Sequence, residues 1–202
     1  RQYATKGYLE KLIAQVFTGR ERFEPGNPQE GYSPSPQERQ SWLQISYMKE
    51  AYHTMGPKFT LGWMAEALYS SKNFSENYTA TMMQAGEFAP TPHSKLMYNE
   101  AFRANQYVAA GIKPIYVLND MFQFRTEFYG FTPIFPIKKN ALNKAYYGKA
   151  FSRFEYMGEV SVICHLPFGA ISAYVNHYSS PRREWNVGMT IGWQLFNYRF
   201  VE

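Results

Sequence analysis

The sequence predicts an all-β fold, an antiparallel up-and-down meander of the kind that forms transmembrane β-barrels, and three observations support this. Apolar residues recur at every second position in most segments, which is the period of a strand with one apolar face. Very short turns and a few long loops join these segments, as in outer-membrane barrels. Aromatic and charged residues each make up 18% of the chain, which is not the composition of a disordered protein.

The first half of the chain contains three expected strands. A strand with mixed alternation is expected at Tyr8–Phe17, before an extended loop at about residues 20–40 that is rich in proline and glycine. The next strand is expected around Trp42–Tyr52. Gly56-Pro57 separates it from a one-sided apolar segment at Phe59–Tyr69, which we expect to be the third strand.

The second half contains five further expected strands, in two hairpins and a final segment, and the whole chain is expected to hold eight or nine. They are Val108–Leu118 and Phe122–Phe128, joined by an Asn119-Asp120 turn, then Glu159–Leu166 and Ile171–Asn176, joined by Pro167-Phe168-Gly169, and finally Trp185–Leu195. At 202 residues, the chain is expected to be a single β-barrel domain or a fragment of one, residues 1–202. Because no signal segment follows Arg1, we expect a processed chain or a fragment.

The last segment has the clearest alternation, over eleven residues. Such a strand, tilted, can cross the hydrocarbon core once. Five of its residues are expected to face lipid: Val187, Met189, Ile191, Trp193 and Leu195. Their neighbours Asn186, Thr190 and Gln194 are expected to face the lumen. The alternative is that the apolar faces pack in the core of a soluble β-barrel or sandwich.

Aromatic residues near the ends of the expected strands suit the two interfacial girdles of a membrane barrel. They are Trp42, Tyr52, Tyr69, Tyr129, Tyr178, Trp185 and Tyr198. The mean hydropathy is -0.45, and no apolar run reaches the length of about 18 residues that a membrane-spanning helix needs.

The net charge of +5 comes from 21 basic and 16 acidic residues, and we expect no nucleic-acid partner. The densest basic stretch contains Lys138, Lys139, Lys144 and Lys149. It is expected to be either a solvated loop or a segment that contacts anionic lipid headgroups.

No catalytic residue, cofactor site or metal ligand is predicted. The single aspartate, Asp120, lies in a turn, and none of the histidines has the His-Glu-x-x-His spacing of a zinc site. The Gly-x-Ser-x-Gly nucleophile motif and the phosphate-binding glycine loop are both absent. A Ser–His site assembled from separate strands of a barrel enzyme would carry no such motif.

Three stretches, with the closing strands, carry a resemblance. Lys6–Tyr8 with Thr18–Gly26, then Phe88–Lys95, then Asn99–Tyr116, and finally Gly158–Trp193 resemble the C-terminal barrel of patatin-like phospholipases of Gram-negative outer membranes. That barrel belongs to the bacterial surface-antigen, or barrel-assembly, superfamily. The resemblance covers almost the whole chain.

The resemblance implies a noncatalytic outer-membrane module that anchors, or helps to export, a patatin-like phospholipase domain. The family's catalytic residues lie in a separate domain whose motifs are absent here, so no catalytic residue is carried over. The family barrel has about sixteen strands, so this chain would supply about its C-terminal half. The implied partners are outer-membrane lipids, the barrel-assembly machinery, and an upstream lipase domain or a second copy of the chain.

The superfamily's inward-folding loop usually carries a Val/Ile-Arg-Gly-Phe/Tyr motif. Its nearest equivalent here is Phe102-Arg103-Ala104-Asn105, which lacks the glycine and the aromatic residue that follows it. Phe102 and Arg103 are therefore the loop candidates, and the alternative for Arg103 is a surface-exposed position. Two other functions stay open: an eight-stranded outer-membrane lipid-modifying enzyme, and a barrel that binds an apolar ligand.

Overall fold

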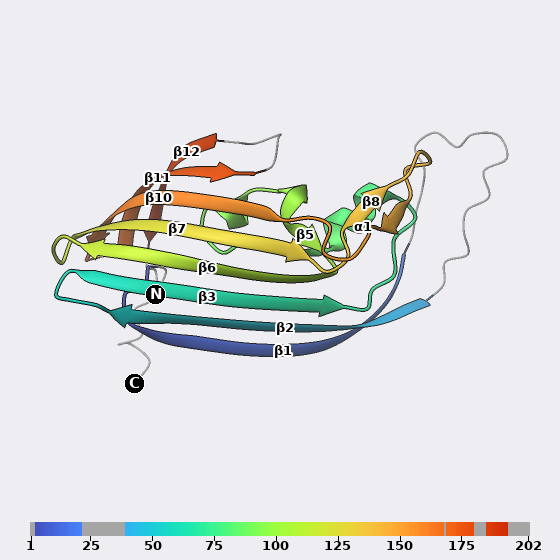
Figure 1. Ribbon diagram of the computed structural model, residues 1–202, viewed down its shortest axis with the longest axis horizontal. Helices are drawn as coiled ribbons and strands as arrows, with labels where there is room; N and C mark the ends of the chain where they lie inside the picture. The colour runs from blue at the N-terminus through green and yellow to red at the C-terminus, as the bar shows by residue number, and fades with distance from the viewer. Residues whose placement is uncertain (1–2, 22–38, 168, 180–184, 194–202) are drawn as a thin grey trace.

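Eight long strands form one antiparallel sheet in the computed structural model, which describes residues 3–21, 39–167, 169–179 and 185–193 (Figure 1). The strands are β1 (Gly7–Arg20), β2 (Arg39–Thr54), β3 (Phe59–Ser70), β6 (Gln106–Val117), β7 (Phe122–Pro133), β10 (Glu155–Leu166), β11 (Gly169–Tyr178) and β12 (Trp185–Trp193). Each pairs with the next long strand along the chain, so the predicted all-β meander is confirmed.

All eight expected strands are present, with boundaries that differ by a few residues. The expected extended loop at about residues 20–40 lies mostly outside the described residues. The sequence predicts no helix or strand in the long connection between β3 and β6. In the structure this connection contains α1 (Tyr78–Gln84), β4 (Gly86–Glu87), η1 (Ser94–Leu96), η2 (Glu100–Phe102) and β5 (Arg103–Ala104). A small hairpin of β8 (Ile137–Lys139) and β9 (Ala145–Tyr147) lies between β7 and β10.

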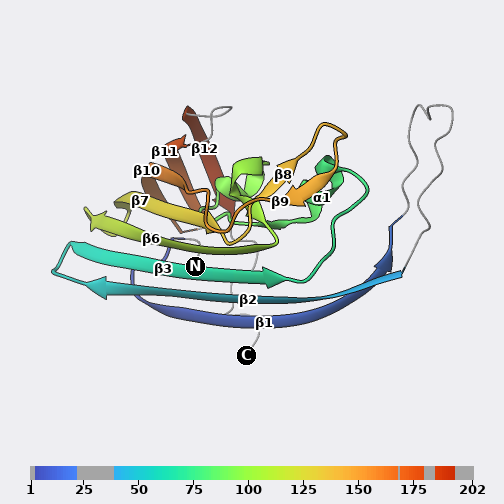
Figure 2. The ribbon, with the colours of Figure 1, turned by 45° about the vertical axis from the view of Figure 1, so that its right-hand side comes forward.

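Residues 71–105, which we call the insert, pack on the concave face of the sheet. In Figure 2, the strands β10, β11 and β12 lie along one side of this segment. Its Phe88 and Phe102 are 2% and 1% exposed and pack against Tyr107 and Phe131 of the sheet. The core therefore lies between the insert and the strands that it covers.

The two faces of the sheet differ in composition. On the convex face, large apolar side chains such as Phe128, Val160 and Val187 are exposed. On the concave face, charged and polar side chains such as Arg125 and Glu159 are buried. This arrangement is the inverse of that in a water-soluble sheet with one covered face.

The first and last strands are the two edges of the sheet. Within the described residues, no hydrogen-bonded ladder joins β1 to β12, so the eight strands form an open, curved sheet and not a closed eight-stranded barrel. No helix in these residues is long and apolar enough to cross a membrane.

Candidate functional site

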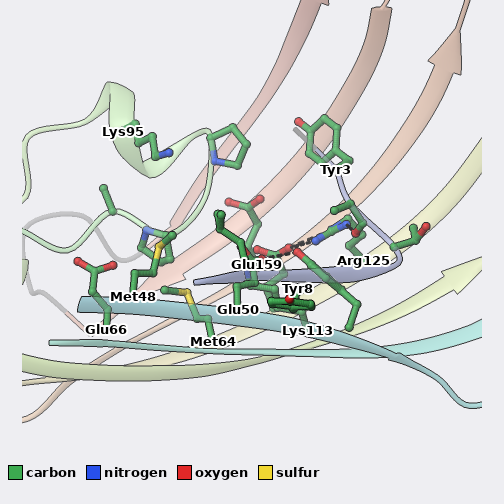
Figure 3. A pocket seen from close by; sticks show the side chains of 18 of the residues that line it. Tyr3, Tyr8, Met48, Glu50, Met64, Glu66, Lys95, Lys113, Arg125 and Glu159 are labelled. Carbon is green, nitrogen blue, oxygen red and sulfur yellow. Dashed lines mark hydrogen bonds and ion pairs between the residues drawn. The ribbon is translucent and has the colours of Figure 1, made fainter. Parts of the chain in front are cut away.

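A cavity of about 1190 Å³ lies between the concave face of the sheet and the insert (Figure 3). The β1 edge also contributes to its lining, through residues such as Tyr8 and Leu9. Nine charged side chains line it: Lys6, Lys95, Lys113 and Arg125, with Glu50, Glu66, Glu87, Glu127 and Glu159. The cavity therefore combines many charged groups with apolar side chains such as Met48 and Met64.

Two ion pairs lie on the strands that form the floor of the cavity, one between two strands and one within β7. Lys113 of β6 pairs with Glu50 of β2. Arg125 of β7 pairs with Glu127 at 2.9 Å, and the Tyr129 hydroxyl donates to the same carboxylate at 2.6 Å. Because these charges are buried, each depends on its partner, and removal of one would leave the other uncompensated.

His93 of the insert links this segment to two strands of the sheet, β10 and β11. Its Nδ1 lies 2.8 Å from Oε1 of Glu159 on β10, and its Nε2 lies 3.3 Å from the Ser172 hydroxyl on β11. The imidazole also stacks on the Tyr174 ring, with 3.5 Å between the centroids. His93 and Ser172 are each 1% exposed, so this contact is sealed from solvent.

The segment before β1 joins the same cluster. The Tyr3 hydroxyl donates to the Ser172 hydroxyl at 2.8 Å, and the Ala4 carbonyl accepts from Arg125 at 2.9 Å. Burial raises the pKa of Tyr3, which keeps its hydroxyl protonated and able to donate. The cluster thus connects five parts of the chain: the N-terminal segment, the insert, β7, β10 and β11.

The sequence does not predict this cluster. It gives His93 no metal-site spacing and places it only within the Phe88–Lys95 stretch, and for Ser172 it indicates only an inward position on a strand. One signal was present, since Glu159 alternates with the apolar Val160 and so belongs to the inward face. The placement of His93 depends on the path of the insert, which no periodicity in the sequence indicates.

Both loop candidates lie inside the insert. Phe102 belongs to the main apolar core. The Arg103 guanidinium donates to the carbonyls of Met83 and Ala85 at 3.2 and 3.3 Å, at the end of α1, and pairs with Glu87. Its side chain is only 12% exposed, so the surface-exposed alternative for Arg103 is wrong. The arginine holds the insert together, and its hydrogen bonds are made within the insert.

Part of the lipid-facing set can be placed. Val187, Met189 and Ile191 are 79%, 67% and 60% exposed on the convex face of β12. Trp193 ends the strand, but its side chain is not among those described, and Leu195 lies outside the described residues.

The structure contradicts the girdle prediction for some aromatic residues, and for others the girdle stays a prediction. Tyr69 and Trp185 are exposed on the convex face. Tyr129 and Tyr178 are buried in the core, and Tyr52 lines the cavity, because all three occupy inward positions of their strands. Trp42 stacks on Phe17, and Tyr198 lies outside the described residues.

In the described part of the chain, no three His, Cys, Asp or Glu side chains are grouped in a way that could hold a metal ion. No protein-family model matches the sequence, and neither a curated protein nor a solved structure matches the chain. The fold and the cavity therefore define the class of the protein on their own: an antiparallel sheet with an apolar convex face and a concave face that buries charged groups beside an apolar core.

Proposed function

We propose that this chain is a noncatalytic outer-membrane β-barrel module that supplies part of a barrel wall and anchors, or helps to export, a patatin-like phospholipase domain. The observation that carries the proposal is the distribution of polarity across the sheet, apolar outside and charged inside. Hydrocarbon outside and a filled polar lumen inside are the environments that such a sheet requires.

The convex face is almost free of charge. Away from Arg20 and Arg39 at the strand ends, the outward positions of the described strands hold a single ion pair, Glu10 with Lys49, whose nitrogen and oxygen are 3.2 Å apart. A continuous apolar surface across eight strands is larger than the patches that soluble monomers usually expose. The acyl chains of lipids can cover such a face, and this needs no partner protein with a complementary surface.

The open edges indicate that more strands are needed. Every backbone N–H and C=O in hydrocarbon must be paired, so a membrane-spanning sheet has to close. The edges of β1 and β12, which pair with no further strand in the described part of the chain, would be completed by upstream strands of the same protein or by a second copy. The link to a patatin-like lipase comes from the resemblance described above. A Gly-x-Ser-x-Gly domain encoded upstream of Arg1 would support it, and a different upstream domain would contradict it.

The orientation of β12 gives a direct test. Ile191→Arg should destabilise the membrane-inserted protein by roughly 2–4 kcal/mol if the residue lies near the membrane midplane. Thr190→Arg, on the opposite face, should cost much less. The measurement is the fraction of folded, heat-modifiable protein in liposomes across a urea series. Equal losses for the two variants would contradict the assigned faces.

One observation favours a second function, a lipid-modifying hydrolase. Ser172, His93 and Glu159 follow the order nucleophile, base and orienting carboxylate. Against this, Ser172 is almost fully buried and its hydroxyl accepts a hydrogen bond from Tyr3. We therefore expect the purified chain to show only background hydrolysis of short-chain esters and phospholipids. Turnover that Ser172→Ala abolishes would establish the enzyme and reject the noncatalytic module.

The apolar-ligand alternative has less support, because nine charged side chains line the described cavity.

A further inference from the structure

The positive charge of the chain is concentrated in one segment. Residues 128–154 contain five basic residues, Lys138, Lys139, Lys144, Lys149 and Arg153, and no aspartate or glutamate. The remaining sequence therefore holds 16 basic and 16 acidic residues, so this segment alone accounts for the net charge of +5.

The four lysines of this segment are available to a partner. All four are exposed, and none forms an ion pair within the part of the chain that the structure describes. Arg153 differs, because it is held by Glu155 at 2.7 Å and by the Ala101 carbonyl at 2.7 Å. It therefore anchors the base of the segment.

Bulky apolar side chains lie among the lysines. Leu142 is 80% exposed at the tip of the β8–β9 hairpin, between Lys139 and Lys144. Phe151 and Phe154, at the base, are 62% and 65% exposed. Exposed apolar groups beside unpaired cations match the boundary between acyl chains and anionic headgroups.

The tip of the hairpin is held in a defined shape. The Asn140 side-chain oxygen accepts from the backbone N–H groups of Leu142 and Lys144, both at 2.9 Å. The Asn143 carbonyl accepts from the N–H of Tyr78 at 2.8 Å, which ties the turn to α1. Ile137 packs on Met82 and Ala85 of the insert. The lysines therefore extend from a fixed platform.

The hairpin lies at the end of the sheet that carries the long connections, opposite the short turns at residues 55–58 and 118–121 (Figure 1). In outer-membrane barrels the long loops lie on the outer surface. We propose that the β8–β9 hairpin binds the phosphate groups of anionic lipid headgroups at that surface, an inference that rests on the proposed membrane function.

The test uses a matched pair of double variants of the 202-residue chain, folded in zwitterionic micelles. Lys139→Gln/Lys144→Gln removes the two cations that flank Leu142. Lys11→Gln/Lys58→Gln removes the same charge from β1 and from a short turn, where both lysines are exposed. Binding of short-chain phosphatidylglycerol is measured by thermophoresis, with short-chain phosphatidylcholine and inorganic phosphate as comparison probes.

We expect the hairpin variant to bind phosphatidylglycerol at least about tenfold more weakly than the unmodified chain, because each lysine near an anionic surface contributes roughly fivefold. The Lys11/Lys58 variant should bind as the unmodified chain does. Leu142→Ser should weaken binding without changing its dependence on salt, because it removes an apolar contact and no charge.

Three results would overturn the proposal: unchanged binding by the hairpin variant, equal weakening in the two double variants, or equally tight binding of inorganic phosphate, which would point to a free anion and not a headgroup. Co-flotation of the chain with liposomes tests the membrane function separately. A chain that floats but whose hairpin variant binds normally would reject only the headgroup site. A chain that does not float would reject the membrane module.

Discussion

The strands β7 and β1 belong to one sheet but differ in how far their inward residues are buried. In β7, inward residues are buried and outward ones are more exposed, in strict alternation. In β1, most residues on both faces are exposed. Both strands carry an inward cation, Arg125 on β7 and Lys11 on β1, but only Arg125 is buried. The strand pattern alone therefore does not decide which face is covered.

The difference comes from what lies on the concave side. The insert and the segment around Tyr3 and Ala4 cover the middle strands, and Arg125 has both a carboxylate and a backbone carbonyl as partners. At the β1 edge, the inward Leu9 is 50% exposed at the rim of the cavity. Among the residues that the structure describes, little covers the inner face of β1, and this is the arrangement that the proposed completion by further strands would explain.

The largest expected effect concerns the edges themselves. A cysteine at Leu12 on β1 and another at Val187 on β12, in a Cys164→Ser background, should be cross-linked between two copies when the chain is folded in detergent. The mass of the detergent complex should correspond to two copies, because each open edge needs a partner. A one-copy mass with cross-links inside that copy would show that the chain closes by itself.

A smaller but still large effect separates the inner faces of the two strands. Arg125→Leu should destabilise the protein by about 3–5 kcal/mol, because it leaves the buried Glu127 without its partner. Lys11→Leu should change stability by no more than about 0.5 kcal/mol. The measurement is urea-induced unfolding in liposomes, followed by loss of heat-modifiable mobility. Similar costs would mean that β1 is covered in the membrane as well as β7 is.

The smallest effect concerns the insert that creates this difference. Arg103→Ala should destabilise the insert by about 1–3 kcal/mol, because it leaves the carbonyls at the end of α1 without this donor and Glu87 without its ion-pair partner. Arg103→Lys should recover only part of this loss, since an ammonium group cannot reproduce the guanidinium geometry. Limited proteolysis within residues 71–105 is the readout. Identical cleavage of the Arg103→Lys variant and the unmodified chain would contradict a specific role for the guanidinium group.

The sheet was predictable because its strands alternate. The outward positions of β12, from Val187 to Ile191, are exposed as the period of two predicts, and the turns marked by Gly56-Pro57 and Asn119-Asp120 join the strands expected. Alternation is a local property, so a strand can be recognised from its own residues, clearly in β12 and less clearly in β1, where the alternation is mixed.

The interior was not predictable by the same means. The contact of His93 with Glu159 spans 66 positions, and that with Ser172 spans 79. Tyr129 and Tyr178 were assigned to a membrane girdle because they lie near strand ends, but their place on the inward face decides their environment. For Arg103, the weak match to a loop motif indicated a loop inside the lumen but not its partners.

The insert also has a consequence for the order of assembly. Its two ends are joined, since the Ser70 N–H donates to the Asn105 carbonyl at 2.7 Å. Its tip, at His93, is held by β10 and β11, which come much later in the chain. Contacts of such long sequence separation carry a loop-closure cost that must be met before they form. His93 can therefore make these contacts only after β10 and β11 have joined the sheet. The formation of its contact with Ser172 thus reports that the sheet extends as far as β11.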